Sequence, residues 1–302
     1  MYDTIIIGAG PAGLCSGIYA TRGGLKTAII EANSVGGQAQ TAADIQNFPG
    51  ILSTSGFDLC YTMMNQCASF GAEFVFDKIT SLTLEGDVKS ISLASGKELQ
   101  SKTIVIASGA SSRKLGVVGE ENFIGKGVSY CATCDGAFFK GKTVAVIGGG
   151  NTAAEDALYL EKLANKVYLV HRRDALRADK ILCDRLEKSN VSILWDSVVE
   201  SLHGKDKIAQ MTLKNVKNNT LTAVSVDGVF VAIGQIPNSQ LFENVKKTES
   251  GYIETDDVMR TNIEGVYAVG DVREKTLRQV VTACADGAIA ADDIIKNLSV
   301  QL

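Results

Sequence analysis

Two cysteines separated by two small residues stand in the stretch SYCATCDG, which runs from Ser129 to Gly136. Such a pair can form half of a zinc site, a structural disulfide, or a redox pair whose disulfide is broken and re-formed in each catalytic cycle. A structural zinc site needs four ligands, but the sequence has no second Cys-x-x-Cys and contains two histidines. A permanent disulfide is disfavoured in a cytoplasmic protein. The pattern therefore favours a redox pair formed by Cys131 and Cys134.

The residue that follows this pair and the other cysteines can be assigned from their neighbours in the sequence. Asp135 follows the pair directly; it can cap a helix, or it can act as the acid for a thiol that must take up a proton, and we favour the acid. Cys60 and Cys67 lie seven residues apart, a spacing typical of one face of a buried helix. Cys15 and Cys284 lie in apolar stretches compatible with helices. We therefore expect these four to pack in the core, and we expect no metal site.

Length and composition indicate a two-domain α/β protein. The chain has 302 residues, of which 30 are Gly and 3 are Pro, and 45% are hydrophobic, which suits many tight turns between strands and helices. The net charge is -4 and no basic run stands out, so we expect no nucleic-acid partner. No apolar run reaches the length of a membrane span, and Asp3 stands where a signal peptide has positive charge. We expect a soluble, cytoplasmic protein that does not contact a membrane.

A degenerate repeat of strand, glycine-rich turn, helix and strand occurs twice, in stretches beginning TIIIGAGPAGL and TVAVIGGGNTAAEDAL. Glycines in such a turn allow a tight bend and let backbone N–H groups approach a pyrophosphate. Ordinary glycine-rich turns are the alternative, but two complete units indicate two dinucleotide sites. The residues expected to hold the dinucleotides at these turns are Gly8, Gly10, Pro11, Ala12 and Gly13 in the first unit and Gly148, Gly150, Asn151, Thr152 and Ala153 in the second.

The residues that close the two units differ in charge. Glu31 ends the first, and its carboxylate can accept hydrogen bonds from the ribose hydroxyls of FAD or NAD. At the matching position the second unit has His171, Arg172 and Arg173, with Arg177 a helical turn later. Guanidinium groups bind a 2′-phosphate that a carboxylate would repel. The alternative is a solvated basic loop; the preceding turn favours an NADPH site.

A second strand end supports a flavin site in the first unit. GVYAVGDV ends in Gly270 and Asp271, and a helix-compatible stretch follows. Asp271 can be an ordinary turn residue, or it can bind a flavin ribitol hydroxyl beside a helix N-terminus. We expect two Rossmann-like domains, with the NADPH domain inserted in a discontinuous FAD domain. The expected ranges are 1–112 for the first part of the FAD domain, 113–240 for the NADPH domain with the redox pair, and 241–302 for the second FAD part.

The motifs together resemble the bacterial-type, low-molecular-weight thioredoxin reductases, from the first strand to the last helix. They are GAGPAG, GGQAQT, NFPG, CATCDG, GGGNTA, HRRDALRADK and GDVREKTLRQVVTACADGAIAA, in the order found in that family. The resemblance implies FAD in the outer domain, NADPH in the middle domain, thioredoxin as partner, and a homodimer. The further residues that it places around FAD are Gly36, Gly37, Gln38, Asn47, Asp271, Arg278, Gln279 and Val280.

The resemblance also implies a role for each catalytic residue. Cys134 would face the flavin, Cys131 would attack the disulfide of thioredoxin, and Asp135 would protonate the departing thiolate. We therefore predict an NADPH-dependent thioredoxin-disulfide reductase. Alternatives are a reductase of another small redox protein, a ferredoxin-fed reductase, or a nucleotide-binding protein without activity. Ferredoxin-fed relatives lack the second glycine turn and the arginine cluster, and both are present here.

Overall fold

The computed structural model describes residues 1–42 and 44–299 and divides the chain into two compact units. The outer unit combines Met1–Ser111 with the segment that begins at Ile236, and the inserted unit consists of Ser112–Gln235. The last residues of the predicted second FAD segment, 300–302, lie outside the described part of the chain. Among the helices of the described residues, none is both long enough and apolar enough to span a membrane.

The outer unit is built on a seven-stranded sheet in the order β3-β2-β1-β6-β5-β4, with β17 also paired to β6. Its strands are β1 (Tyr2–Ile7), β2 (Thr27–Glu31), β3 (Glu73–Phe76), β4 (Ile79–Thr83), β5 (Lys89–Leu93), β6 (Glu98–Ile106) and β17 (Val266–Ala268). β1 pairs in parallel with both β2 and β6, and β17 joins β6 in parallel. The sheet therefore includes a strand from each of the two segments of the outer unit.

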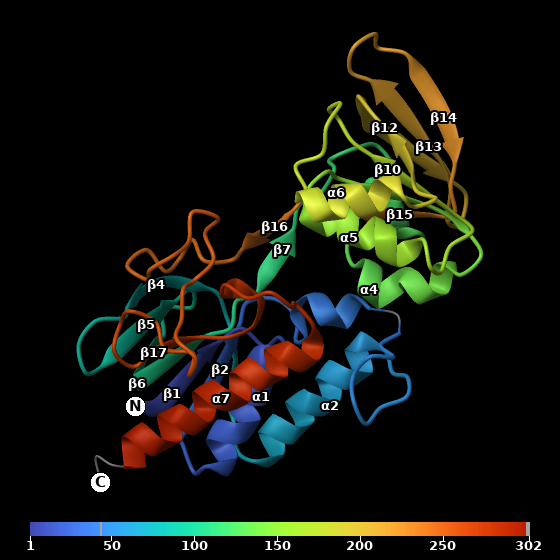
Figure 1. The fold of residues 1–302 in the computed structure, drawn as a ribbon. Coiled ribbons are helices and arrows are strands. Elements are labelled where there is room, and N and C mark those ends of the chain that lie inside the picture. Colours follow the sequence, from blue (N-terminus) through green and yellow to red (C-terminus); the bar gives the residue numbers. More distant parts are fainter. Residues whose placement is uncertain (43, 300–302) are drawn as a thin grey trace. The chain divides into compact units, whose positions relative to one another are not determined.

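Side chains alternate between the two faces of this sheet. Ile6 of β1 packs with helices, whereas its neighbours Ile5 and Ile7 belong to the core on the opposite face. The helices are α1 (Pro11–Arg22), α2 (Gly56–Ser69) and α7 (Val280–Ser299), with 3₁₀ turns η1 (Gly37–Thr41) and η3 (Gly270–Val272). Figure 1 shows α7, near the end of the chain, beside α1 from its beginning, and the two helices share one core. This packing closes the discontinuous unit.

The inserted unit has a five-stranded parallel sheet in the order β11-β10-β9-β15-β8 and an antiparallel sheet in the order β12-β13-β14. Its strands are β8 (Val128–Ser129), β9 (Thr143–Ile147), β10 (Lys166–Val170), β11 (Ser192–Leu194), β12 (Ser197–Gly204), β13 (Ile208–Asn215), β14 (Leu221–Ser225) and β15 (Gly228–Val231). Its helices are α3 (Glu120–Phe123), α4 (Ala132–Asp135), η2 (Gly136–Phe139), α5 (Asn151–Leu160) and α6 (Lys180–Glu187).

The central strand of the inserted unit is covered on both faces. Val144 and Val146 of β9 pack with residues of α5 and α6, whereas Ala145 and Ile147 pack with Met211 and other residues of the antiparallel sheet. A strand buried on both faces reads as a continuous apolar run, as TVAVI does. The units β1–α1–β2 and β9–α5–β10 thus confirm the predicted Rossmann-like α/β fold.

The chain crosses between the units along two short strands, β7 (Ala110–Ser112) and β16 (Gln235–Pro237). These strands pair with each other in a separate two-stranded sheet. The backbone N–H of Arg113 extends the pairing by donating to the carbonyl of Gly234 over 3.0 Å. Both crossings are therefore held in one hydrogen-bonded ribbon.

Candidate active site

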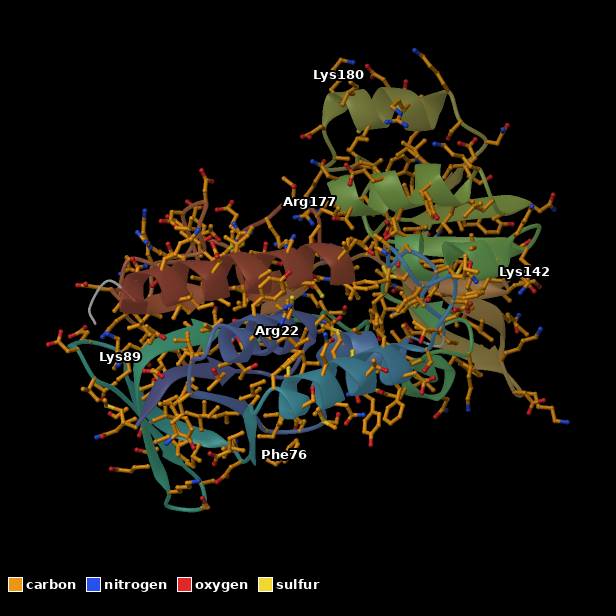
Figure 2. All side chains as sticks on the ribbon, turned by 90° about the horizontal axis from the view of Figure 1, so that it is seen from below. Arg22, Phe76, Lys89, Lys142, Arg177 and Lys180 are labelled. Carbon is orange, nitrogen blue, oxygen red and sulfur yellow. A yellow bond between two sulfur atoms is a disulfide. The ribbon has the colours of Figure 1, made fainter. Side chains whose placement is uncertain are left out.

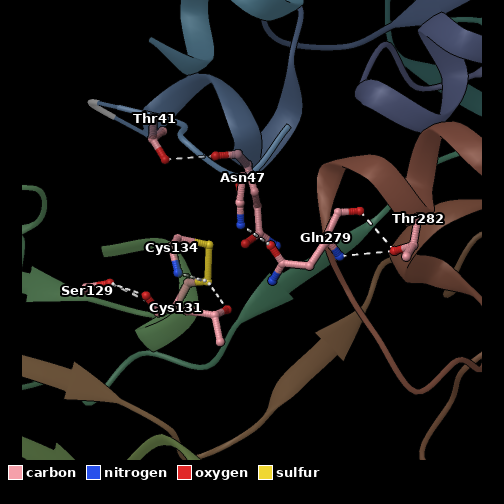
Figure 3. The surroundings of a disulfide bond; sticks show 9 residues. Thr41, Asn47, Ser129, Cys131, Cys134, Gln279 and Thr282 are labelled. Atoms are coloured by element: carbon pink, nitrogen blue, oxygen red, sulfur yellow. Dashed lines mark hydrogen bonds between the residues drawn. A yellow bond between two sulfur atoms is a disulfide. The ribbon is translucent and has the colours of Figure 1, made fainter. Parts of the chain in front are cut away.

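A disulfide joins Cys131 and Cys134 at the start of α4, with 5.3 Å between the two Cα atoms (Figure 3). Cys131 is the N-cap residue of α4, and its sulfur accepts the backbone N–H of Cys134 over 3.2 Å. Both cysteines are partly exposed. The sequence-predicted pair is therefore bonded in the structure, and a backbone donor is directed at one of its two sulfurs.

The hydroxyl of Ser129 connects the pair to its neighbouring carboxyl group. This buried side chain accepts the backbone N–H of Cys131 over 3.1 Å, and it also forms a hydrogen bond with Asp135. Burial raises the pKa of Asp135, and the bond from Ser129 partly opposes that shift. Asp135 therefore retains its proton to a higher pH than an exposed carboxyl group. Ser129 was not predicted as a site residue, although a hydroxyl two residues before the first cysteine is visible in the sequence.

The redox turn is packed on the helix that follows the second glycine-rich turn. A Cβ at Gly136 would lie 2.9 Å from the ring of Tyr159 and 3.0 Å from Leu160, both in α5. Only glycine allows such a close approach without a shift of the neighbouring side chains. The turn is therefore held against α5 inside the same unit.

The three glycines of the first turn have separate structural roles. Gly8 adopts a φ of 107°, which favours glycine, and a Cβ at Gly13 would lie 2.0 Å from the carbonyl oxygen of Gly8. A Cβ at Gly10, by contrast, would have no atom within 4 Å. The outer glycines therefore make the bend and the close helix–strand contact. The middle glycine borders open space, as expected where a pyrophosphate approaches the backbone.

Glu31 is fixed at the end of β2 beside this turn. Its carboxylate accepts the backbone N–H of Ala9 and that of Asn33, each over 2.8 Å. The backbone N–H of Gly36 donates to the carbonyl of Ala9, also over 2.8 Å. The structure thus brings together the glycine turn, the predicted ribose-binding acid and the start of the GGQAQT segment.

Two buried polar atoms near η3 lack a partner in the described part of the chain. They are Oδ1 of Asp271 and Nε of Arg278. Burial raises the pKa of Asp271, and the charges of Lys275 and Arg278 partly offset this. Buried polar atoms are rarely left unpaired in a protein. A ligand that offers a hydroxyl donor and an acceptor oxygen would satisfy both atoms, so these residues fit a flavin.

A residue that the sequence analysis missed positions this segment. Asp286 of α7 is buried, accepts the backbone N–H of Gly270 over 3.0 Å and pairs with Lys275 over 2.7 Å. It therefore anchors the GDV turn to α7. An acidic residue inside the apolar stretch TACADGAIAA was the signal for it.

The other residues predicted around FAD all lie in the outer unit. Asn47 donates to the side chain of Gln279 over 3.0 Å, joining two segments far apart in the sequence (Figure 3). Gln38 donates to the carbonyl of Ala110, next to the first crossing. Gly36, with a φ of 108°, is the N-cap of η1, Gly37, with a φ of 53°, is its first residue, and Val280 begins α7.

The second glycine-rich turn repeats this arrangement with one difference. A Cβ at Gly148 would lie 2.7 Å from the Cβ of Ala153, the residue in place of the third glycine. A Cβ at Gly150 would again meet nothing within 4 Å. The side chain of Asn151 is bonded to Asp179 in two hydrogen bonds of 2.8 Å, so it orients the start of α6. Thr152 is exposed.

His171 packs against the second turn. It is 5% exposed, and its ring lies 2.2 Å from where a Cβ at Gly149 would stand. Burial lowers the pKa of His171, and the charges of the neighbouring arginines lower it further. The backbone N–H of Arg177 donates to the carbonyl of Gly149 over 2.7 Å. The basic segment is therefore attached to the glycine turn at Gly149 in two ways, by the packed imidazole of His171 and by the backbone N–H of Arg177.

The guanidinium groups of this segment are exposed. Arg172 and Arg173 follow His171, and Figure 2 shows Arg177 on the loop before α6. The nearby acids Asp174 and Asp196 both pair with Lys217, over 3.5 and 2.9 Å. Along the described residues, no ion pair links these acids to the arginines. The segment can therefore present unneutralised positive charge to an anion.

Comparisons with known proteins agree with this geometry. The pyridine nucleotide-disulphide oxidoreductase family matches residues 2–287. The chain is 44% identical to the thioredoxin reductase of Bacillus subtilis (strain 168), over 97% of this chain and 94% of that protein. It is 45% identical to that of Peptoclostridium acidaminophilum, over 96% and 95%. The crystal structure of thioredoxin reductase from Streptococcus pyogenes MGAS5005 is similar with a TM-score of 0.94 and 43% identity, over 99% of both chains.

Proposed function

Because the chain belongs to the pyridine nucleotide-disulphide oxidoreductase family, and within it to the thioredoxin reductases, we propose that it is an NADPH-dependent thioredoxin-disulfide reductase. One observation carries the proposal. The Cys131–Cys134 disulfide stands beside a partly buried acid, Asp135, in a unit that has its own dinucleotide-type turn. A redox-active disulfide next to a proton donor is what reduction of a protein disulfide requires.

FAD is the cofactor that we propose for the outer unit. The open space at Gly10, the fixed carboxylate of Glu31 and the unpaired atoms of Asp271 and Arg278 support this assignment. When bound, FAD would supply the two-electron chemistry that connects NADPH to the disulfide. The residues proposed to hold it are Gly8, Gly10, Pro11, Ala12, Gly13, Glu31, Gly36, Gly37, Gln38, Asn47, Gly270, Asp271, Arg278, Gln279 and Val280.

NADPH is the electron donor that we propose for the inserted unit. The exposed arginines after β10 favour a 2′-phosphate, and their attachment to the turn at Gly149 supports a role in cofactor selection. The residues proposed to hold it are Gly148, Gly150, Asn151, Thr152, Ala153, His171, Arg172, Arg173 and Arg177.

The chain's own residues would then complete the exchange with thioredoxin. In the reduced pair, the Cys131 sulfur would attack the disulfide of thioredoxin, stabilised as a thiolate by the Cys134 N–H that it already accepts. Asp135 would give its proton to the departing thiolate of thioredoxin. The Cys134 thiol would next displace the second thioredoxin sulfur and restore the Cys131–Cys134 bond.

The partner and the assembly state are inferred from the resemblance. We propose thioredoxin, or a related small dithiol protein, as the substrate, and a homodimer as the working form. Multi-angle light scattering of the purified protein measures the assembly directly, and a monomer mass at working concentration would contradict the dimer.

One assay tests the function. Flavin absorbance of the purified protein is measured first, and then NADPH oxidation with oxidised thioredoxin, with NADH and reduced ferredoxin as alternative donors. We expect bound flavin and thioredoxin-dependent oxidation of NADPH that exceeds that of NADH. Reduction of the disulfide by ferredoxin and not by NADPH would contradict the proposal, as would a protein without flavin.

A further inference from the structure

Four cysteines outside the redox pair lie in the helical core of the outer unit. They come from three helices: Cys15 from α1, Cys60 and Cys67 from α2, and Cys284 from α7. Cys15, Cys60 and Cys67 are 9%, 1% and 0% exposed, whereas Cys284 is partly exposed. The proposed function uses none of these thiols.

Two of the four thiols meet where α1 and α7 are closest. A Cβ at Gly287 of α7 would lie 2.2 Å from the carbonyl oxygen of Ala12 and 2.9 Å from the backbone N of Ser16, so no side chain separates the helices. Cys284 lies one turn before Gly287, and Cys15 lies between Ala12 and Ser16 in the sequence. A disulfide needs its two Cα atoms within roughly 7 Å, which such close helix contact favours.

The thiols of Cys15 and Cys284 interact with each other. The Cys284 thiol lies 3.8 Å from the carbonyl oxygen of Pro11, one helical turn before Cys15. The two thiols also form a hydrogen bond with each other, which lowers the pKa of Cys15 and raises that of Cys284. Cys15 is therefore the thiol favoured as the nucleophile, and Cys284 the thiol that attacks its oxidised form.

The thiols of α2 are in a different situation. Cys67 donates to the carbonyl oxygen of Leu14 over 3.0 Å, and Cys60 lies 3.9 Å from that of Gly36. Burial raises the pKa of Cys67 to about 12 and that of Cys60 to about 11. These two remain protonated and engaged with backbone oxygens, so they serve as internal references for Cys15 and Cys284.

We propose that Cys15 and Cys284 form a second, oxidant-sensitive dithiol, which a hydroperoxide closes to a disulfide between α1 and α7. The Cys15 thiolate attacks one oxygen of hydrogen peroxide and becomes a sulfenic acid, and the released hydroxide takes up a proton to give water. The Cys284 thiol then attacks the Cys15 sulfur, forms the S–S bond and releases a second water. Two sulfur atoms together lose two electrons, and one peroxide is reduced to two waters.

The cross-link would act on a part of the outer unit that is central to the proposed flavin site. α1 begins at Pro11, directly after the first glycine turn, and α7 begins at Val280, directly after Arg278 and Gln279. A disulfide here would fix the starts of these two helices relative to each other. Peroxide would therefore oxidise this pair independently of Cys131 and Cys134.

Peptide mapping of the flavin-loaded, full-length protein tests the proposal. The protein is exposed to hydrogen peroxide, remaining thiols are alkylated under denaturing conditions, and the digest is analysed by mass spectrometry without reduction. We expect one cross-linked species that joins the peptides of Cys15 and Cys284, with a mass two hydrogens below their sum, which dithiothreitol separates. Cys183 of the inserted unit, partly exposed and without a thiol partner among the described residues, provides a reference.

Variants separate a specific pair from general oxidation. Cys284→Ala should abolish the cross-link and leave Cys15 as a sulfenic acid that dimedone labels, whereas Cys67→Ala should leave the cross-link unchanged. Full alkylation of both Cys15 and Cys284 after peroxide treatment that oxidises Cys183 would overturn the proposal. A cross-link from Cys15 to Cys67 in the unaltered protein would overturn it as well. Flavin content measured before treatment verifies that each variant is folded.

Discussion

Replacing Arg172 and Arg173 by alanine tests whether the inserted unit selects NADPH through its 2′-phosphate. Both side chains are exposed and follow His171, which is packed on the glycine turn at Gly149. The acids Asp174 and Asp196 are engaged with Lys217, and no ion pair among the described residues joins an acid to either arginine. The two guanidinium groups can therefore be removed without unpairing a protein carboxylate, and a change in cofactor preference reports on the phosphate alone.

The expected magnitude follows from the exposure of the two arginines. A hydrogen bond to a charged group contributes about 1.5–3 kcal/mol, and solvent exposure places these arginines near the lower value. About 1.4 kcal/mol corresponds to a tenfold change in affinity. Each single variant should therefore raise the KM for NADPH about tenfold. Because the two residues are adjacent, the double variant should lie between about 10-fold and 100-fold.

Initial rates of thioredoxin reduction, measured against NADPH and against NADH, give the ratio of kcat/KM for the two donors. The variants should lose activity with NADPH and keep it with NADH, which lacks the phosphate. Arg185→Ala, which removes an exposed guanidinium group from α6 of the same unit, is the matched control and should leave the ratio unchanged. Equal losses with both donors would refute the reasoning and assign the arginines to the stability of the unit.

Three further predictions concern the redox pair and the first turn. Cys131→Ser should leave the flavin reducible by NADPH and abolish thioredoxin reduction, while Cys183→Ser changes neither; thioredoxin reduction at a normal rate would contradict the assigned role. Asp135→Asn should slow thioredoxin reduction by about 10²-fold or more. The raised pKa of Asp135 means that the wild-type rate falls as pH rises and the proton is lost, so this high-pH decline should be missing from the variant's pH profile. Gly10→Ala should fold yet purify with less flavin, whereas Gly13→Ala should fail to fold, as circular dichroism and flavin absorbance will show.

The parts of the fold that follow from local sequence were predictable. In β1–α1–β2 the apolar run, the glycines and the helix start are contiguous, and Gly8 and Gly13 meet across a single turn. Glu31 could be placed beside the glycine turn because β2 runs parallel to β1, so its carboxyl end lies at the edge of the sheet where that turn begins. The positions of these residues depend on backbone geometry that the neighbouring residues determine.

The site residues that the sequence did not predict depend on contacts between distant segments. Asp286 holds the N–H of Gly270, and Cys284 meets Cys15 across two helices from opposite ends of the chain. The periodicity of one segment does not specify which residues of another segment will contact it. Ser129 is close to its partners in the sequence. Its role beside Asp135 depends on the burial of that carboxyl group, which the sequence alone does not give.

The two glycine turns show why the same pattern can tolerate a change at one position and not at another. In the first turn a methyl group at Gly13 would collide with the backbone oxygen of Gly8. In the second turn the methyl group of Ala153 is fully buried, and it faces Gly148, which has no side chain. Ala153 thus requires a glycine at position 148, but a glycine alone is not sufficient, because Gly8 is also one. The backbone differs as well, with a φ of 158° at Gly148 and of 107° at Gly8. A substitution at Gly148 should therefore be as damaging as one at Gly13, because any Cβ there would meet Ala153 and the backbone of Ala232 at once.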